Sequence, residues 1–292
     1  MKITAVGDCG IDRYVDLRAD RPGGISLNFA ANAKIWFEAG DRISVLTALG
    51  QDREAAVVEG TIARLGVGAF IAKGPGVTPV QYIDHDATGE RVFVRYEAGV
   101  LAQHRLTGPE REILRQGDVM IATVFTQITD FFETVADAPS GGLRALDYCN
   151  LGTPEDPLRY VHRYAERFDL GFFGLSATQG ALIDELDAIA RRAGRVFIVT
   201  LGVEGSLALG EKQRIAVPAV SVRKVVDTTG AGDSFAAGFL SHYARSRELE
   251  ASLARGAEAA ARTIGQIGAF PAPLVPWPAD APAEWTALKR SR

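Results

Sequence analysis

Residues 226–240 read Val-Asp-Thr-Thr-Gly-Ala-Gly-Asp-Ser-Phe-Ala-Ala-Gly-Phe-Leu. Apolar side chains follow the glycines at near-helical spacing, at Phe235, Phe239 and Tyr243, and predict a helix that begins close to residue 230. The small residues 230–232 leave their backbone N–H groups open, and the first N–H groups of a helix have no acceptor within the helix. Because the helix dipole also favours negative charge there, this stretch is typical of an anion site.

A carboxylate lies inside this anion site, at Asp233. A negative side chain beside a bound anion is unfavourable unless it has a chemical task. The task that fits best is to accept the proton of a hydroxyl group that attacks a phosphoryl group. The structural alternative is a helix cap, because aspartate is common at that position. The length of the run and the motifs elsewhere in the chain favour the chemical role.

Composition and charge narrow the class of protein. The 292 residues carry a net charge of −4, which gives no electrostatic reason to expect binding to nucleic acid or to an anionic membrane. Cys9 and Cys149 stand in apolar, strand-like surroundings, so we expect reduced core thiols rather than a disulfide or a metal pair. The chain begins with a strand pattern and has no run of about 18 apolar residues, so we expect a soluble cytoplasmic protein.

Short apolar runs alternate with helix-like runs along most of the chain. Apolar strands without alternation are typical of a parallel sheet that is covered by helices on both faces. The sequence therefore predicts an α/β fold. We expect strands over residues 3–6, 43–49, 119–124, 145–148, 170–173 and 196–201, and helices over 28–39, 54–65, 158–168 and 181–193.

One region breaks this pattern. Residues 76–97 alternate apolar and polar side chains around a turn at 87–89, which predicts an antiparallel hairpin, and residues 14–20 could add a strand to it. A small sheet inserted early in an α/β domain can form a lid over a cleft. The alternative is an ordinary edge hairpin. The tail, residues 271–292, is rich in Pro and Ala, and we expect an extended strap or a loosely packed end.

Polar residues follow the first predicted strand. Asp8 and Asp12 come directly after it, and ligands bind at the carboxyl ends of parallel strands. Two carboxylates there suit the hydroxyl groups of a polyol. Further on, the pair Gly23-Gly24 lets a ligand approach the backbone, and Asn28 can both donate and accept a hydrogen bond. Each of these residues also has a structural alternative, as a turn residue or a helix cap.

A second turn, Thr-Leu-Gly-Val-Glu-Gly-Ser at 200–206, could hold a nucleotide phosphate or ribose, although such turns are also common in hairpins. Two familiar nucleotide motifs are absent from the sequence. It contains no Gly-x-x-x-x-Gly-Lys-[Ser/Thr] loop, and no Gly-x-Gly-x-x-Gly follows the first strand. The four histidines are scattered and show no metal-ligand spacing.

The order of these motifs resembles the ribokinase, or PfkB, family of carbohydrate kinases. The motifs are Gly-Asp at 7–8, Gly-Gly at 23–24, Thr-Leu-Gly-x-x-Gly at 200–205 and Asp-Thr-Thr-Gly-Ala-Gly-Asp-Ser-Phe at 227–235. The resemblance covers residues 1 to about 270. It implies a ribokinase-like three-layer α/β/α domain over residues 1–292, with a mostly parallel sheet and a small β-sheet lid formed by about residues 12–20 and 76–100.

The resemblance also implies roles for single residues. Asp233 matches the catalytic base, and Gly230, Ala231 and Gly232 match the anion hole that faces the transferred phosphoryl group. ATP with Mg²⁺ is the implied phosphoryl donor. Asp12, Gly24 and Asn28 match sugar-binding positions, Thr200, Gly202 and Gly205 match nucleotide contacts, and Asp227 and Thr229 match a loop that holds a monovalent cation such as K⁺ in many members.

Two positions depart from the family pattern. Many members carry an Asn-x-x-Glu motif that organises the magnesium-water network, whereas this chain has Ser176-Ala177-Thr178-Gln179. Ser176 and Gln179 can order water beside the nucleotide, but Gln179 cannot supply the charge of a glutamate. Ile25 stands where sugar-binding relatives often have lysine, which argues against a plain ribokinase.

Within the family the chain looks most like bacterial fructoselysine 6-kinases, on Gly-Asp-Cys-Gly-Ile-Asp-Arg-Tyr at 7–14 and on residues 91–93 and 96–100. This implies ATP-dependent phosphorylation of a hydroxymethyl group of a fructosamine such as fructoselysine. Arg91 and Arg95 could bind a substrate carboxylate, or could be solvated lid residues. Lid sheets in this family often pair between subunits, which implies a homodimer through the lid.

Two other functions stay open at this point. One is a kinase for another small substrate: fructose, 2-keto-3-deoxygluconate, ribose or a nucleoside. The other is a sensor of nucleotide or sugar on the same fold that does no chemistry. The intact Asp233 argues against a sensor, because a sensor has no need of a base.

Overall fold

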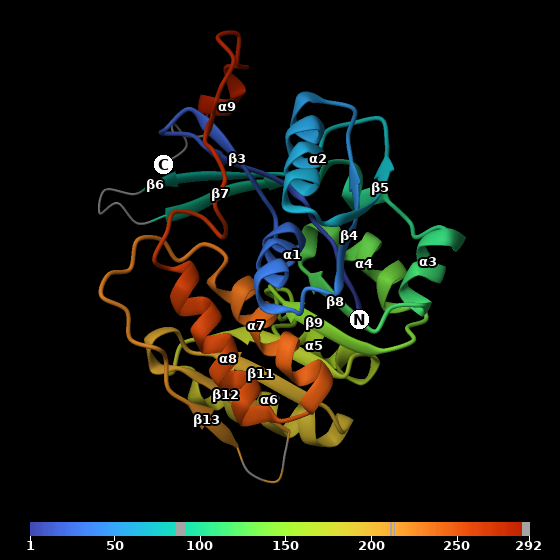
Figure 1. Ribbon diagram of the computed structural model, residues 1–292, viewed down its shortest axis with the longest axis vertical. Coiled ribbons are helices and arrows are strands. Elements are labelled where there is room, and N and C mark those ends of the chain that lie inside the picture. Colours follow the sequence, from blue (N-terminus) through green and yellow to red (C-terminus); the bar gives the residue numbers. More distant parts are fainter. Residues whose placement is uncertain (86–90, 211, 213, 288–292) are drawn as a thin grey trace.

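The computed structural model describes residues 1–85, 91–210, 212 and 214–287. These residues form a nine-stranded sheet with helices on both faces and a five-stranded sheet beside it (Figure 1). The large sheet has the strand order β13-β12-β11-β10-β9-β8-β1-β4-β5, and all strands from β11 to β5 run parallel. This is the three-layer α/β/α arrangement with a mostly parallel sheet that the sequence predicts.

The strands of the large sheet are short and mostly buried. They are β1 (Lys2–Val6), β4 (Arg42–Leu49), β5 (Gly68–Lys73), β8 (Val119–Val124), β9 (Leu143–Tyr148), β10 (Leu170–Gly174), β11 (Val196–Thr200), β12 (Ser206–Leu209) and β13 (Ile215–Val217). The five-stranded sheet, called the small sheet below, is mixed and has the order β14-β3-β2-β6-β7. Its strands are β2 (Gly10–Tyr14), β3 (Ala19–Gly23), β6 (Val80–His85), β7 (Arg91–Glu97) and β14 (Val275–Pro276).

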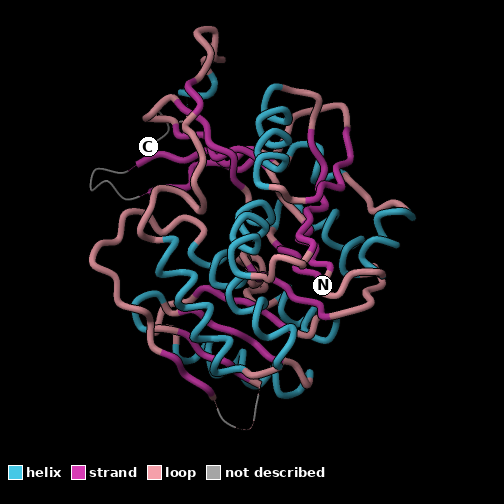
Figure 2. Tube along the Cα trace, viewed as in Figure 1, coloured by secondary structure: helices cyan, strands magenta, loops and turns pink. Residues whose placement is uncertain are grey.

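Helices cover both faces of the large sheet (Figure 2). They are α1 (Ile25–Trp36), α2 (Arg53–Leu65), α3 (Gly108–Arg115), α4 (Thr129–Ala136), α5 (Arg159–Tyr164), α6 (Gly180–Ala193), α7 (Ala231–Ser246) and α8 (Leu249–Thr263). A further short helix, α9 (Glu284–Ala287), lies in the tail beside the small sheet. None of these helices combines the length and the apolar character that crossing a membrane would require.

The core consists of two apolar clusters, one on each face of the sheet. The strand β8 shows why: all six of its side chains are buried, with Ile121 in one cluster and Met120 in the other. Helices α1, α2, α7 and α8 supply the first cluster, and α3 to α6 supply the second. A strand buried on both faces must be apolar throughout, which is why these strands lack alternation.

The predicted strands and helices of the large sheet are confirmed, with shifted ends. Helix α1 begins at Ile25 instead of residue 28, directly after Gly24, which has a φ of 97°. A side chain at Gly24 would come within 2.6 Å of the Asp8 carbonyl oxygen, so the chain can bend into the helix there only with glycine. Cys149 is exposed rather than a core thiol, because it lies just past the end of β9.

The small sheet differs in detail from the prediction. The stretch over residues 14–20 does add to this sheet, but as the ends of two strands, β2 and β3, and not as one strand. Residues 15–18 form the turn between them, in which Arg18 has a φ of 49°. The hairpin of β6 and β7 is present, and its predicted turn at 87–89 lies outside the described residues. The predicted strap is present too, since β14 pairs with β3 and forms one edge of the sheet.

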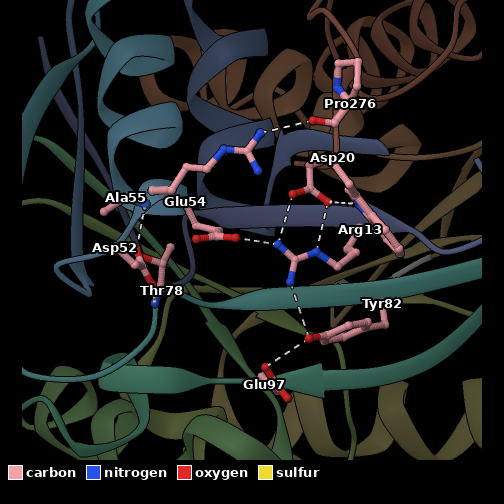
Figure 3. A network of polar contacts seen from close by, with 11 residues as sticks. Arg13, Asp20, Asp52, Glu54, Ala55, Thr78, Tyr82, Glu97 and Pro276 are labelled. Atoms are coloured by element: carbon pink, nitrogen blue, oxygen red, sulfur yellow. Dashed lines mark hydrogen bonds and ion pairs between the residues drawn. The ribbon is translucent and has the colours of Figure 1, made fainter. Parts of the chain in front are cut away.

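A buried polar network ties the small sheet to α2 and to the chain's last helix. Arg13 donates to both oxygens of Asp20 at 2.9 and 3.0 Å and to Glu54 at 2.6 Å (Figure 3). The indole N–H of Trp277 donates to Asp20 at 2.8 Å, and the Arg13 guanidinium lies 3.3 Å from the centre of the Trp285 ring. The network thus fixes the strap onto the sheet through contacts that join residues far apart in the sequence.

Candidate active site

The loop of residues 228–230, Thr-Thr-Gly, leads into α7, with Gly230 as the residue that caps the helix. Gly230 has a φ of 69°, and a side chain there would come within 2.2 Å of the Ala269 Cβ atom. Only glycine fits this combination of backbone angle and close approach. Asp233 is then the third residue of the helix, so its carboxylate lies at the helix start rather than acting as the cap.

The start of α7 presents N–H groups as the sequence predicts, with one exception. The first bond within the helix runs from Ser234 N to Gly230 O at 2.9 Å, so the N–H groups of Gly232 and Asp233 have no acceptor within the helix. The N–H of Ala231 donates to Thr228 O at 3.2 Å. Gly232 is exposed. A ligand anion would therefore meet Gly232 and Asp233 first.

Asn28 connects the other half of the predicted site to Asp233. It lies in α1, where it is 6% exposed, and its Nδ2 donates to Asp233 Oδ2 at 2.9 Å. Helices α1 and α7 pack against each other, and Asn32, one turn after Asn28, donates to Ala269 O at 3.0 Å. The hydrogen bond brings together two motifs that lie 205 residues apart in the sequence.

Two further carboxylates come from the end of β1 and from β2. Asp8 is 5% exposed, and its Oδ1 accepts a hydrogen bond from Ile25 N at 3.1 Å, which fixes the start of α1. Asp12 lies over the backbone of Gly23, where an added Cβ would come within 2.4 Å of its carboxyl group. Asp8, Asp12, Gly24 and Asn28 are thus all within one small region at the carboxyl end of β1.

Asp147 belongs to the same site, although none of the sequence motifs contains it. It lies in β9, paired with Thr123 of β8, and with Asp233 it lines a pocket at the carboxyl ends of these strands. The neutral residues that complete the lining are Ala5, Ile25, Ser26, Phe29, Ile121, Thr123 and Ala236. The one signal in the sequence was a charged residue within the otherwise apolar run of residues 145–148.

These carboxyl groups share a poorly solvated region, which changes their ionisation. Burial raises the pKa of Asp147 to about 7, with a further contribution from Asp8, and burial raises the pKa of Asp8 to about 6. The pKa of Asp233 is raised well above its ordinary value, by burial first and then by Asp147. The hydrogen bond from Asn28 acts in the opposite direction, because it stabilises the ionised carboxylate.

The predicted nucleotide turn lies at the carboxyl end of β11, beside the predicted Ser176–Gln179 segment. Leu175 N donates to Thr200 O at 3.0 Å, and Gln179 Oε1 accepts from Ser176 N at 2.8 Å. One strand separates β11 from β9, so the turn lies about 10 Å to the side of Asp147, given about 4.8 Å between neighbouring strands. Gly202 and Gly205 in this turn both have positive φ angles.

The loop predicted to hold a monovalent cation is closed by its own hydrogen bonds. Asp227 Oδ1 accepts from the N and Oγ1 atoms of Thr229, both at 2.8 Å, and Asp227 Oδ2 accepts from Gly268 N at 2.7 Å. These bonds fix the loop that precedes Gly230. Its binding of K⁺ stays a prediction.

The two arginines predicted for substrate binding lie in β7. The side chain of Arg91 is outside the part of the chain that the structure describes. Arg95 pairs with Glu97 at 2.6 Å, and its guanidinium lies 4.2 Å from the centre of the Tyr82 ring. Arg95 is therefore held within the small sheet, and its role in binding a substrate carboxylate stays a prediction.

Comparison with known proteins identifies the family. A family model described as pfkB family carbohydrate kinase matches residues 172–274. The fructoselysine 6-kinase of Shigella flexneri is 31% identical over 272 residues, which are 92% of this chain and 99% of that protein. The chain belongs to the PfkB family of carbohydrate kinases.

Two further proteins are similar to this PfkB kinase over most of its length. The fructosamine kinase FrlD of Bacillus subtilis is 29% identical over 92% of this chain and 93% of that protein. The structure of Arabidopsis thaliana ribokinase, complexed with ribose and ATP, superposes with a TM-score of 0.77 at 20% identity, covering 92% of this chain and 94% of that chain. This PfkB kinase therefore has the ribokinase fold and is a phosphotransferase with an alcohol group as acceptor.

Proposed function

We propose that this PfkB kinase transfers the γ-phosphoryl group of ATP to the 6-hydroxymethyl group of a fructosamine such as fructoselysine. The observation that carries the proposal is the Asn28–Asp233 hydrogen bond of 2.9 Å at the start of α7. This hydrogen bond joins the proposed base, Asp233 at the anion-binding start of α7, to Asn28 in the proposed sugar-binding region. The fructosamine part rests on relatives whose names state fructoselysine and fructosamine as substrates.

In this proposal Asp233 accepts the proton of the substrate hydroxyl as that oxygen attacks phosphorus. Asn28 holds the carboxylate in position and favours its ionised form. The N–H groups at the start of α7, at Gly232 and its neighbours, face the negative charge on the phosphoryl oxygens. Asp12 and Gly24 bind the sugar. Phosphoryl transfer is mainly a matter of positioning and charge neutralisation, which such fixed groups supply.

The nucleotide would lie along the carboxyl ends of β10 and β11. Thr200, Gly202 and Gly205 form a turn there, and Ser176 and Gln179 lie beside it. Mg²⁺ with the nucleotide supplies neutralisation of the phosphate charge. Among the described residues no three His, Cys, Asp or Glu side chains are placed to hold one metal ion, which fits a magnesium ion that is bound mainly through phosphate oxygens.

The small sheet is the proposed lid. Its strands β2 and β7 carry Asp12 and Tyr96, and Asp8, at the end of β1, acts on the ionisation of Tyr96. Closure of this sheet over the sugar would exclude water from the transferred phosphoryl group. A homodimer through the small sheet stays a prediction. Among the described residues the outer strands of this sheet are β14, which covers β3, and β7.

The test is a kinase assay with a panel of fructosamines, fructose, 2-keto-3-deoxygluconate, ribose and nucleosides, read by mass spectrometry of the phosphorylated product. We expect fructoselysine to give the highest kcat/KM. Replacement of the base, Asp233→Asn, should lower kcat by about 10²–10⁴-fold and leave the Kd for ATP within about threefold. A panel in which no fructosamine exceeds fructose would contradict the substrate, and an active Asp233→Asn variant would contradict the mechanism.

A further inference from the structure

Arg21 brings a positive charge from the small sheet to the segment that supports the anion-binding loop. It extends from β3, where it is 7% exposed, and its Nη2 donates to the carbonyl oxygens of Ile267 and Phe270 at 3.1 and 3.0 Å. An added Cβ at Gly268 would come within 2.7 Å of Nη2 and 2.9 Å of Cζ, so the guanidinium lies against the backbone of Gly268. Because arginine keeps its proton in proteins, this charge is permanent.

Residues 267–270 in turn contact the loop that precedes α7. The N–H of Gly268 donates to Asp227 Oδ2 at 2.7 Å, on the loop predicted to hold K⁺. Ala269 lies against Gly230, where an added side chain would come within 2.2 Å of the Ala269 Cβ atom. The guanidinium therefore acts on the segment that fixes both the loop and the start of α7, where the N–H groups for an anion lie.

The oxygen atoms around this loop leave little for a K⁺ ion to bind. Such an ion exchanges its water for protein oxygens, often backbone carbonyls. Both carboxylate oxygens of Asp227 already accept hydrogen bonds, and a K⁺ bound there would be close to the guanidinium, which flanks the same glycine. Two positive charges in a poorly solvated place repel each other. The neighbouring carbonyl groups that already accept hydrogen bonds are those of Thr228, Ile264, Ile267, Ala269 and Phe270.

We propose that the Arg21 guanidinium supplies the fixed positive charge next to residues 227–230 in place of a monovalent cation, so that ATP binding by this kinase does not depend on K⁺. Arg21 is then a positioning residue, which acts on the phosphate site through residues 267–270. The inference rests on the proposed function only in that the start of α7 binds the phosphate groups of ATP. Because Arg21 belongs to β3, the same contact connects the proposed lid to the phosphate site.

The test compares potassium chloride with tetramethylammonium chloride at equal ionic strength, since the second cation is too large for a site made of protein oxygens. Calorimetric titration gives the Kd for ATP with Mg²⁺, and thermal unfolding without nucleotide gives Tm. For the wild-type enzyme we expect Kd values within about twofold and Tm values within about 1 °C in the two salts.

Removal of the arginine should create a response to K⁺. Arg21→Ala should bind ATP about tenfold more weakly than wild type in tetramethylammonium, the scale of a hydrogen bond to a charged group. K⁺ should enter the space that the side chain leaves, restore the Kd to within about threefold of wild type and raise Tm by at least about 2 °C. The exposed Arg18, in the turn before β3, is the matched control, and Arg18→Ala should keep the wild-type Kd in both salts.

A wild-type enzyme whose ATP affinity or Tm rises in K⁺ beyond these limits overturns the inference. So does an Arg21→Ala variant that binds ATP as wild type does, or whose loss is equal in both salts, because Arg21 would then not act as a cation. If Arg21→Ala does not fold, as seen by circular dichroism, Arg21→Lys decides: wild-type affinity in both salts supports the inference and a tenfold loss overturns it. None of these measurements uses a sugar, so inactive fructosamines would contradict the proposed function alone.

Discussion

Asn28 Nδ2 donates a hydrogen bond of 2.9 Å to Asp233 Oδ2, and this contact joins α1 to the first turn of α7, 205 residues later. The bond serves two purposes. It fixes the orientation of the carboxylate, and it opposes the rise in pKa that burial and Asp147 impose on Asp233. The ionisation of Asp233 therefore depends on the balance between burial and neighbouring carboxylates, which raise its pKa, and one amide, which lowers it.

Replacement of the amide should shift the pH dependence of turnover. Asn28→Ala removes a bond that favours the ionised base, so the pKa of Asp233 rises and the acid limb of the pH profile of kcat moves to higher pH. We expect a loss of roughly tenfold at pH 6 that becomes smaller at pH 9. Asn32→Ala, one turn further along α1, is the matched control and should leave the limb in place. An equal loss at all pH values would mean that Asn28 only binds the sugar.

The opposite shift is expected at Asp147. Asp147→Asn removes the negative charge that contributes most to the raised pKa of Asp233 after burial itself. The base then ionises more easily, so the acid limb for a neutral sugar such as fructose should move to lower pH. The measurement is kcat against pH for both proteins with saturating fructose. A limb that stays in place would show that Asp147 and Asp233 titrate independently.

Asp147→Asn should also make the unliganded protein more stable at alkaline pH. The pKa of Asp147 is about 7 in the folded state, against an ordinary value of 3.8, so the folded state binds more protons between these values. The contribution of Asp147 to stability therefore falls as pH rises from about 4 to 7. We expect the variant to gain on the order of 1–2 kcal/mol at pH 8 and almost nothing near pH 4, as measured by urea unfolding. An equal gain at both pH values would contradict the linkage.

The two glycines that flank Ala231 should respond differently to alanine. Gly230→Ala places a side chain on a φ of 69° and 2.2 Å from Ala269, so we expect a loss of about 2–3 kcal/mol and of most turnover. At Gly232 an added Cβ meets nothing within 4 Å, and Gly232→Ala should match or exceed wild-type stability. Its turnover should still fall, because the methyl group enters the space of the phosphoryl group. Thermal unfolding and kcat together check both expectations.

Arg13 should be essential for the stability of the small sheet. Its side chain is 2% exposed and pairs with Asp20 and Glu54, so Arg13→Met leaves two poorly solvated carboxylates without their partner. We expect a loss of about 3–5 kcal/mol in the free energy of unfolding. The exposed Arg18 in the adjacent turn is the control, and Arg18→Met should cost less than about 1 kcal/mol. Similar losses in the two variants would contradict a special role of the buried pair.

The large sheet could be predicted because its strands are buried on both faces, and strands of this kind are continuous apolar runs in the sequence. The place of Asp233 in the first turn of a helix could be predicted because its motif is local: the glycines, the helix and the carboxylate are adjacent in the chain. Asp147 could not, since a single aspartate at the end of an apolar strand has the same pattern whether or not it faces a ligand. Its environment depends on Asp8 and Asp233, which only the folded chain brings near it.

The Arg13 network could not be predicted from the sequence either, because it joins residues from distant parts of the chain. Its members come from β2, β3, α2, β6 and the tail, and none of them follows a local rule. The turn at residues 15–18 was also missed, because Arg18 adopts a φ of 49° that arginine seldom takes. When partners far away in the sequence determine the conformation of a residue, local propensity does not predict that conformation.

The order in which the ribosome delivers the strands has a consequence for biogenesis. Four strands of the small sheet are complete by Glu97, whereas β14 comes from Val275 and Pro276, almost 180 residues later. Until residue 277 has been synthesised, the edge of β3 has no strand to pair with. Asp20 also lacks the hydrogen bond from Trp277 until then. The edge of β3 thus stays unprotected for most of translation, and an open strand edge is the kind of surface that can pair with another chain.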